Sequence, residues 1–178
     1  MEYVPCTEFR QLYPQLVKDD IKWILLQVLR GLDFAHSKGV VHRDIKPGNV
    51  LMDIQRNSQG QTVSRNLKIV DWGLADFYEP AKRFNCRVAS RYFKGPELLL
   101  GNNYYDYSLD VWSVGCMMAG MVFMKEPFFK GTDNDDQLIK IAKVLGTQSV
   151  MEYVEKFDHI TLTEYFKEHL LNYKQKPF

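Results

Sequence analysis

The sequence has few cysteines and no marked excess of charge of either sign. Its 178 residues contain three cysteines, Cys6, Cys86 and Cys116, odd in number and widely spaced. This pattern fits neither a disulfide framework nor a zinc site, so reduced intracellular thiols are expected. Lysine and arginine number 23 against 22 aspartates and glutamates, a net charge of +1. A chain this close to neutral lacks the overall basic charge typical of nucleic-acid binding.

Long apolar runs, internal repeats and low-complexity tracts are also missing. The most apolar stretch, residues 109–124, is short for a membrane span and carries Asp110 and Ser113 near its start. The chain does not open with a cationic segment followed by an apolar one, so no signal peptide is expected. Hydrophobic residues make up 46% and charged residues 25% of the chain, values ordinary for a globular protein. We expect one partial domain.

Two polar motifs flank an apolar stretch between Val41 and Gly73. The first is His42-Arg43-Asp44-Ile45-Lys46-Pro47-Gly48-Asn49, and the second is Asp71-Trp72-Gly73. They match the catalytic loop H-R-D-x-x-x-x-N and the metal-binding D-F-G of protein kinases, with Trp in place of Phe. Two such motifs in the right order, with strand-like residues between them, rarely arise by chance. The chain therefore resembles the protein kinase family.

The motif residues suit phosphoryl transfer. Asp44 would accept or orient the proton of a substrate hydroxyl. Asn49 and Asp71 supply the hard oxygen ligands that Mg²⁺ prefers. Lys46 would offset charge on the transferring phosphoryl group, and in the family it marks Ser/Thr rather than Tyr specificity. Each residue alone has a plainer interpretation, as a turn former or a solvated side chain, but the ordered set favours catalysis.

The flanking sequence predicts a scaffold for these motifs. Residues 19–37 are predicted to form a helix, because Asp19 and Asp20 are good caps and apolar residues follow at helical spacing: Ile21, Ile24, Leu25, Val28, Leu29 and Leu32. Residues 40–41 are predicted to form a short strand after Gly39. Residues 50–52 and 67–70 are predicted to form a hairpin, which would place Asn49 and Asp71 at neighbouring strand ends. The polar segment 53–66 is predicted to be a solvated loop, with surface padding favoured over a regulatory role.

Residues 71–97 narrow the resemblance to the catalytic (alpha) subunit of casein kinase II. They contain Asp71 to Tyr78 and then Asn85-Cys86-Arg87-Val88-Ala89-Ser90-Arg91-Tyr92-Phe93-Lys94-Gly95-Pro96-Glu97. The likeness runs from Met1 to roughly Phe157. It implies a mainly α fold with short β hairpins, a partial protein-kinase C-terminal lobe whose N-terminal lobe is absent. The expected divisions are a hinge remnant at 1–7, the catalytic lobe at 8–157 and a divergent tail at 158–178.

The apolar stretch at 109–124 is expected to form a helix surrounded by protein. Its early carboxylate, Asp110, needs partners in such a setting, and the family uses this residue to hold the catalytic-loop backbone. Trp72 is expected to fix the turn after Asp71 through its N–H group. The resemblance implies a segment held ready without phosphorylation, in which Ser90, Tyr78 and Tyr92 are structural or substrate-facing.

Residues 80–95 carry five cations and no acid: Lys82, Arg83, Arg87, Arg91 and Lys94. This local excess favours an anionic ligand. The resemblance implies that Arg87, Arg91 and Lys94 bind the residue after the phosphoacceptor and prefer acidic or phosphorylated sequences. A solvated basic loop is the plainer alternative. A nucleic-acid patch is disfavoured, because the nearby aromatic residues belong to the kinase motif.

No glycine-rich phosphate loop and no V-A-I-K-type lysine occur in the sequence. Glu2 and Val4 lie in the hinge-like segment, where their backbone would meet adenine, with Leu51 and Val70 as an apolar floor. The arginine that pairs with Glu97 in the family is also missing, which leaves Glu97 poorly compensated. The chain alone is therefore expected to be marginally folded and weakly active or inactive.

Three hypotheses follow. The first is an acidophilic Ser/Thr protein kinase using ATP, or GTP in its place, with Mg²⁺. The second is a non-catalytic module that binds acidic proteins through its basic groove, and the third is an incomplete gene product. The resemblance implies acidic Ser/Thr substrates and a nuclear and cytoplasmic location. A regulatory beta subunit is implied only for a complete form that has the docking lobe. Neither nucleic acid nor a membrane is expected as a partner.

Overall fold

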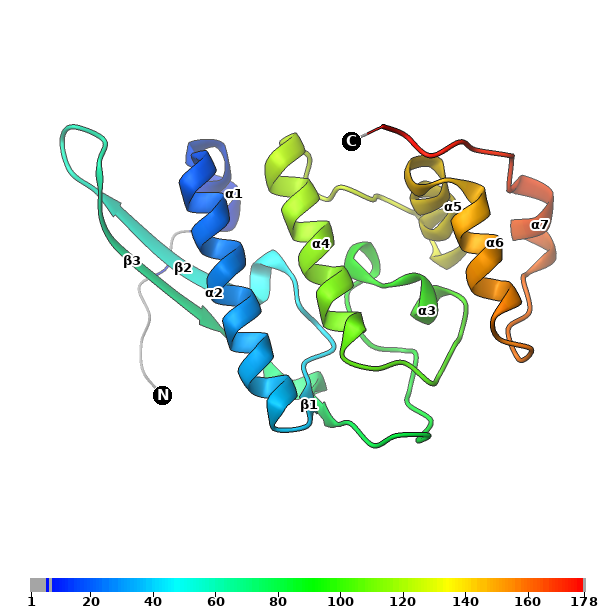
Figure 1. Ribbon diagram of the computed structural model, residues 1–178. Coiled ribbons are helices and arrows are strands. Elements are labelled where there is room, and N and C mark those ends of the chain that lie inside the picture. The colour runs from blue at the N-terminus through cyan, green and yellow to red at the C-terminus, as the bar shows by residue number, and fades with distance from the viewer. Residues whose placement is uncertain (1–5, 7, 178) are drawn as a thin grey trace.

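Helices α2 and α4 lie side by side at the centre of the computed structural model, which describes residue 6 and residues 8–177 (Figure 1). The helices are α1 Phe9–Leu12, α2 Lys18–Ser37, α3 Pro96–Leu99, α4 Ser108–Phe123, α5 Asn134–Leu145, α6 Thr147–Glu155 and α7 Glu164–His169. The strands are β1 Val40–Val41, β2 Val50–Arg56, β3 Thr62–Ile69 and β4 Asp76–Phe77. Short 3₁₀ turns occur at Tyr13–Gln15, Pro47–Asn49, Trp72–Leu74 and Arg91–Phe93.

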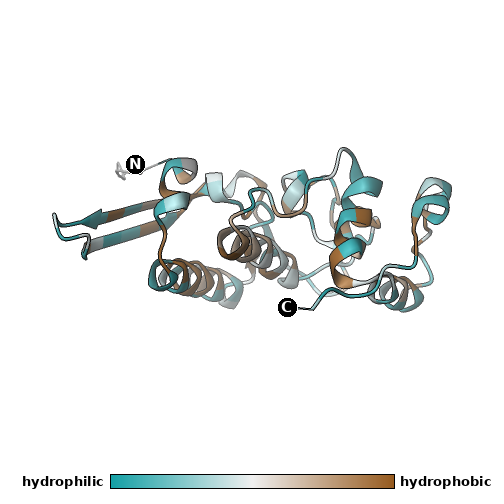
Figure 2. Ribbon diagram, turned by 90° about the horizontal axis from the view of Figure 1, so that it is seen from above, coloured by the Kyte–Doolittle hydropathy of each residue, from teal (hydrophilic) through white to brown (hydrophobic). Residues whose placement is uncertain are grey.

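The helix predicted at 19–37 is confirmed as α2. Ile24, Val28 and Leu32 recur at helical spacing and are buried in one cluster with Met117 and Met121 of α4. Figure 2 shows hydrophobic residues concentrated along these two helices. The interface between α2 and α4 is therefore the main core of the protein.

Helix α4 confirms the helix predicted at 109–124, but the expectation that protein surrounds it is wrong. Its buried side chains face α2 and the Arg91–Phe93 turn. Four apolar side chains on the rest of its surface remain about half exposed, namely Val111, Met118, Val122 and Phe123. Within the described residues, neighbours cover only part of the circumference of α4. The apolar composition of the helix does not reveal which of its faces is left open.

The hairpin is much longer than the sequence predicted. Strands β2 and β3 pair in antiparallel register from Val50↔Ile69 to Arg56↔Thr62, so most of the predicted loop at 53–66 is strand. Only residues 57–61 form the turn, where the Asn57 side-chain oxygen accepts the N–H groups of Gln59 and Gln61. The hairpin projects from the body of the molecule (Figures 1 and 2).

The half of this projection next to its turn is fixed by a buried carboxylate on α2. Asp20 is fully buried and forms ion pairs with Arg56 of β2 and, at 2.7 Å, with Arg65 of β3. Burial would raise the pKa of Asp20, but hydrogen bonds from Val17 N–H and the two guanidinium groups outweigh it and lower that pKa. Asp20, predicted only as a helix cap, therefore also anchors the inserted strands.

A second, two-stranded sheet brings distant segments together next to the catalytic motif. Strand β1 pairs antiparallel with β4, with Val41 opposite Asp76. The chain just before His42 is therefore held against the chain just after Gly73. The predicted strand at 40–41 is confirmed.

The C-terminal part has its own small core. Leu138, Ala142, Val150 and Phe166 are buried together between α5, α6 and α7. The segment after α7 returns along this unit, where Thr147 N–H donates to Tyr173 O at 3.0 Å. The tail at 158–178 is thus packed as far as it is described. None of the helices in the described part of the chain is long and apolar enough to cross a membrane.

Candidate active site

The backbone of the catalytic loop is held by Asp110, in the first turn of α4. This fully buried carboxylate accepts the N–H groups of His42 at 2.9 Å and Arg43 at 2.8 Å. It also contacts His36 Nε2 at 2.8 Å, at the end of α2. The buried carboxylate thus has the partners that its position demands. Both central helices contribute to the fixed path of the loop.

Arg43 joins the catalytic loop to the segment after Asp71. Its φ of 68° lies in the left-handed region, which is uncommon for a non-glycine residue. The guanidinium group forms an ion pair with Asp76 at 3.1 Å and donates to Leu74 O at 2.6 Å. It also reaches the Tyr105 hydroxyl at 3.3 Å. An internal carboxylate therefore satisfies this cation.

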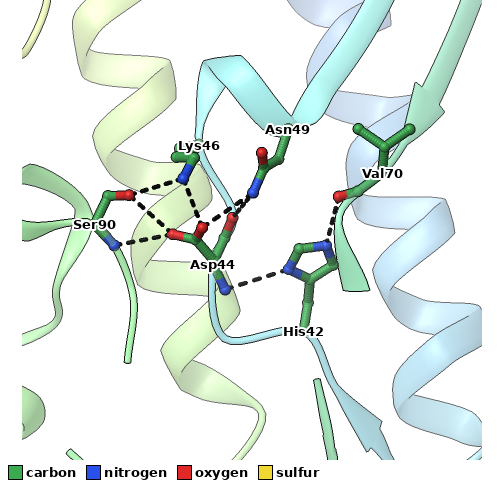
Figure 3. A network of polar contacts seen from close by, with 6 residues as sticks. All are labelled: His42, Asp44, Lys46, Asn49, Val70 and Ser90. Carbon is green, nitrogen blue, oxygen red and sulfur yellow. Dashed lines mark hydrogen bonds and ion pairs between the residues drawn. The ribbon is translucent and has the colours of Figure 1, made fainter. Parts of the chain in front are cut away.

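Asp44 lies at the centre of a polar network (Figure 3). Its side chain is buried, and one carboxylate oxygen accepts the backbone N–H and the hydroxyl of Ser90, at 2.9 and 3.0 Å. The other oxygen accepts the Lys46 ammonium at 2.6 Å and the Asn49 amide at 3.1 Å. The structure thus brings together the three predicted catalytic residues Asp44, Lys46 and Asn49. A carboxylate fixed in this way is able to orient a substrate hydroxyl and accept its proton.

Ser90, which was expected to be structural or substrate-facing, completes this network through contacts that the sequence did not predict. Its hydroxyl accepts a hydrogen bond from Lys46 Nζ at 3.0 Å while donating to Asp44. The side chains of Asp44 and Lys46 are therefore held by a residue more than forty positions away. No short motif spans that separation. The signal available in the sequence was the position of Ser90 inside the basic segment.

His42 links the catalytic loop to the Asp71-Trp72-Gly73 motif. Its Nδ1 accepts the N–H of Asp44 at 3.2 Å, so the proton is assigned to Nε2, which donates to Val70 O at 3.1 Å. Burial lowers the pKa of His42, although the nearby carboxylates of Asp110, Asp44 and Asp71 partly oppose that effect. His42 is therefore a neutral structural bridge with Asp44 and Asp71 close by.

Trp72 packs against this bridge. Its ring centroid lies 4.5 Å from that of His42, and its indole N–H donates to Ile69 O at 3.2 Å. The predicted hydrogen bond of Trp72 across the turn after Asp71 is therefore confirmed. Asp71 itself adopts a φ of 62°, a left-handed conformation that costs free energy in a non-glycine residue. The hydrogen bond from Trp72 to Ile69 helps to hold the turn that contains Asp71.

Asn49 and Asp71 occupy neighbouring strand ends, as predicted. Asn49 immediately precedes β2, Asp71 follows β3, and Val70 N–H donates to Asn49 O at 2.9 Å. The Asn49 amide nitrogen donates to the backbone oxygen and to a carboxylate oxygen of Asp44. The amide oxygen of Asn49 is therefore the atom that can bind a cation. The Asp71 side chain is exposed. These two oxygen donors fit Mg²⁺, which takes few protein ligands. No cluster of three or more His, Cys, Asp or Glu side chains suited to a metal occurs among the described residues.

The residues predicted for the nucleotide lie beside these donors where they are described. Leu51 is in β2 and Val70 follows β3, and both are partly exposed. They are close in the hairpin, because Leu51 pairs with Lys68, which is two residues before Val70. Glu2 and Val4, the predicted hinge contacts, lie outside the described residues.

The predicted substrate-binding cations have different settings. Arg87 is exposed, whereas Arg91 is exposed but donates to Thr132 O at 2.5 Å. Lys94 is half-buried and donates to Val88 O at 2.5 Å. Burial lowers the pKa of Lys94, and the positive charge of nearby Arg91 adds to that effect. Lys94 therefore also organises the backbone of the basic segment.

Glu97 is largely buried beside an apolar cavity of about 480 Å³ along α4. Among the ion pairs of the described residues, none involves Glu97. Burial raises the pKa of its carboxyl group, and the negative charge of Asp106 raises it further. The predicted poorly compensated carboxylate is thus present.

We expect Glu97→Gln to raise the free energy of unfolding at pH 7 by about 1–2 kcal/mol, because it removes a buried charge while keeping the side-chain shape. Urea unfolding at several pH values measures this change. The gain exists only above the ordinary carboxyl pKa of 4.5, where the unfolded chain ionises, and disappears at lower pH because both states are then protonated. The exposed Glu168→Gln is the control. Equal stability of Glu97→Gln and the unaltered chain at pH 7 would contradict the prediction.

A comparison with models of known families agrees with this arrangement. The model described as protein kinase domain matches residues 1–174, almost the whole chain. Members of this family transfer a phosphoryl group from ATP, generally with Mg²⁺. Together with the cluster around Asp44 and the oxygen donors at the hairpin base, this match shows that the chain belongs to the protein kinase family.

Proposed function

We propose that this chain phosphorylates Ser or Thr residues in acidic sequence contexts, as a kinase of the casein kinase II alpha type. The observation that carries the proposal is the place of Ser90. Its N–H and hydroxyl bind Asp44, and the next residue is Arg91. The basic segment 80–95 therefore passes directly beside the catalytic carboxylate. A substrate hydroxyl directed at Asp44 would have its following residues close to these cations.

Chain residues account for the main steps of the reaction. Asp44 orients the hydroxyl and takes its proton, while Lys46 carries positive charge next to that carboxylate. Asn49 and Asp71 would hold Mg²⁺, and Leu51 and Val70 would meet the base of ATP or GTP. Bound Mg²⁺ neutralises developing charge on the nucleotide phosphates.

The ion pair between Arg43 and Asp76 supports activity without a phosphorylated activation segment. A cation in the catalytic loop would otherwise need an anion, and Asp76 supplies one from within the chain at 3.1 Å. The other parts of the proposal rest on the resemblance alone: acidic protein substrates, a nuclear and cytoplasmic location, and a regulatory beta subunit for a form with the docking lobe.

Phosphorylation of matched peptides tests the acidic preference. Each peptide carries one Ser followed by Glu residues, by Gln residues or by Lys residues, and initial rates are measured with Mg-ATP. We expect the Glu peptide to be preferred, and Arg87→Ala or Arg91→Ala each to reduce its advantage over the Gln peptide roughly three- to fivefold. The advantage should also shrink as salt is added.

Lys174→Ala, an exposed cation in the tail, is the matched control and should leave the peptide preference unchanged. Equal rates on the Glu and Gln peptides would contradict the proposed specificity. Tight binding of the Glu peptide with no phosphate transfer would instead favour a non-catalytic module that binds acidic proteins.

A further inference from the structure

Thr132 is followed by more acidic residues than any other serine or threonine of the chain. Its sequence context is Thr132-Asp133-Asn134-Asp135-Asp136, which places three carboxylates within the next four residues. Each of the other serines and threonines has at most one acid in the same window. The sequence therefore contains its own best match to the acidic context that the proposed kinase prefers.

Thr132 lies at the surface, in the loop that leads from α4 into α5, and its side chain is exposed. Its hydroxyl group has two alternative acceptors, a carboxylate oxygen of Asp133 at 3.2 Å and one of Asp136 at 3.4 Å. Both distances are longer than those of ordinary hydroxyl hydrogen bonds. The hydroxyl group of Thr132 is therefore accessible and only loosely held.

The residues after Thr132 are held by the first turn of α5. Asp133 accepts the N–H of Asp136 at 2.8 Å, and an Asp136 carboxylate oxygen accepts the N–H of Thr132 at 3.0 Å. Both bonds are exposed to solvent, and helix ends fray. The buried residues of α5 begin only at Gln137. The acceptor segment can therefore extend when one exposed turn opens, while the buried part of the helix stays in place.

A cation of the basic segment already contacts this acidic stretch. Arg91 Nη1 donates to Thr132 O at 2.5 Å, and α5 lies against the Arg91–Phe93 turn. Arg91 is one of the cations proposed to bind the acidic residues of a substrate. This contact is an observation independent of the sequence around Thr132, and it links that sequence to the basic segment.

We propose that Thr132 is a phosphorylation site, modified by a second copy of this kinase. The proposal rests on the proposed function, because the acids after Thr132 would be bound by the basic segment of that copy. The bond between the γ-phosphorus of Mg-ATP and its bridging oxygen breaks, and ADP leaves with the electron pair. A new bond forms between this phosphorus and Thr132 Oγ1, and the hydroxyl proton passes to Asp44 of the second copy.

Phosphorylation of Thr132 would change the charge beside Arg91. A phosphothreonine carries about −1.5 to −2 charges at pH 7 and has strong acceptor oxygens. On Thr132 this charge is added to the residue whose carbonyl group already binds the Arg91 guanidinium. It therefore competes with an acidic substrate for Arg91, so the modified kinase should have a weaker preference for acidic peptides.

Mass spectrometry of the phosphatase-treated full chain, before and after incubation with Mg-ATP, tests the site directly. Cleavage after Lys130 and Lys140 releases residues 131–140, in which Thr132 is the only residue with a hydroxyl group. We expect one phosphoryl group on this fragment. The exposed Ser58, which no acid follows within four residues, should stay unmodified.

Four variants separate the acceptor from its acidic context. Thr132→Ser should retain the modification of the 131–140 fragment, and Thr132→Ala should lose it. Asp135→Asn should slow the modification roughly three- to fivefold, because it removes one of the acids that the basic segment would bind. Asp33→Asn, which neutralises an exposed carboxylate on α2, is the matched control and should leave the rate unchanged.

An isotopically labelled Asp44→Asn chain identifies the copy that transfers the phosphoryl group. Its 131–140 fragment should be modified only when the unlabelled active chain is added, at a rate that rises with the concentration of that chain. Modification of the Asp44→Asn chain by itself would overturn the proposal, because another enzyme would be the source. Modification confined to the active chain and unaffected by dilution would also overturn it, because transfer would then occur within one copy.

The Glu and Gln peptides measure the consequence for Arg91. Modification of Thr132 should lower the Glu-over-Gln preference about as much as Arg91→Ala does, and Mg-ATP should not change the preference of Thr132→Ala. An equal preference before and after full modification would contradict this role.

Failure of the site is distinguishable from failure of the proposed function. An unmodified 131–140 fragment from a chain that phosphorylates the Glu peptide would overturn Thr132 as a site and leave the proposed function intact. If neither peptide were phosphorylated, the proposed function would fail, and the proposal for Thr132 would fail with it.

Discussion

Asp44→Asn is expected to lower the rate constant of phosphoryl transfer roughly 10²- to 10⁴-fold relative to the unaltered chain, the range found for loss of a general base. The amide keeps the size of the side chain and one acceptor oxygen, but it cannot take up the proton of the substrate hydroxyl. Peptide affinity should change little, because in the proposed complex the acidic residues of the peptide contact Arg87 and Arg91 rather than Asp44. Single-turnover rates and peptide binding together measure the two quantities.

Ser90→Ala is the informative companion to this variant. It removes one hydrogen bond to Asp44 and one acceptor for Lys46 but leaves the carboxylate in place. Its rate loss should be much smaller, on the order of tenfold, the effect of one net hydrogen bond. If Asp44→Asn retained more than a tenth of the original rate, Asp44 would not be the proton acceptor.

Asp110→Ala is expected to reduce the free energy of unfolding by about 3–5 kcal/mol. The change leaves the buried N–H groups of His42 and Arg43 without an acceptor and removes the partner of His36. Such a loss is a large part of the stability of an ordinary domain, about 5–15 kcal/mol. Urea unfolding followed by circular dichroism measures it.

The control for this experiment is Asp19→Ala, an exposed carboxylate in the first turn of α2. It should change stability by less than about 0.5 kcal/mol, as surface substitutions usually do. A loss below about 1 kcal/mol for Asp110→Ala would mean that water or the remaining side chains satisfy the loop N–H groups.

The sequence predicted those features that depend on local pattern. Helical spacing of apolar residues located α2, and the two motifs located Asn49 and Asp71 at adjacent strand ends. Each of these features is encoded within a short stretch of chain. The sequence also indicated that Asp110 needs partners, because it is a carboxylate in an apolar helix, and the family resemblance implied that these partners lie in the catalytic loop.

Features that depend on distant partners were missed. The segment at 53–66 has turn-forming residues, but its strands are stabilised by Asp20, more than thirty positions away on α2. The turn propensity of these residues gave no sign of the contact with Asp20, because tertiary contacts override local propensity. The hydrogen bond between Ser90 and Asp44 likewise joins residues that are far apart in the sequence.

The open face of α4 affects how the protein must be handled. Contiguous apolar side chains on a surface favour self-association, and Met118, Val122 and Phe123 lie about half exposed on one helix. Light scattering across a dilution series would reveal whether oligomers form. Kinetic and unfolding measurements should therefore be made at protein concentrations where the light scattering per molecule is constant.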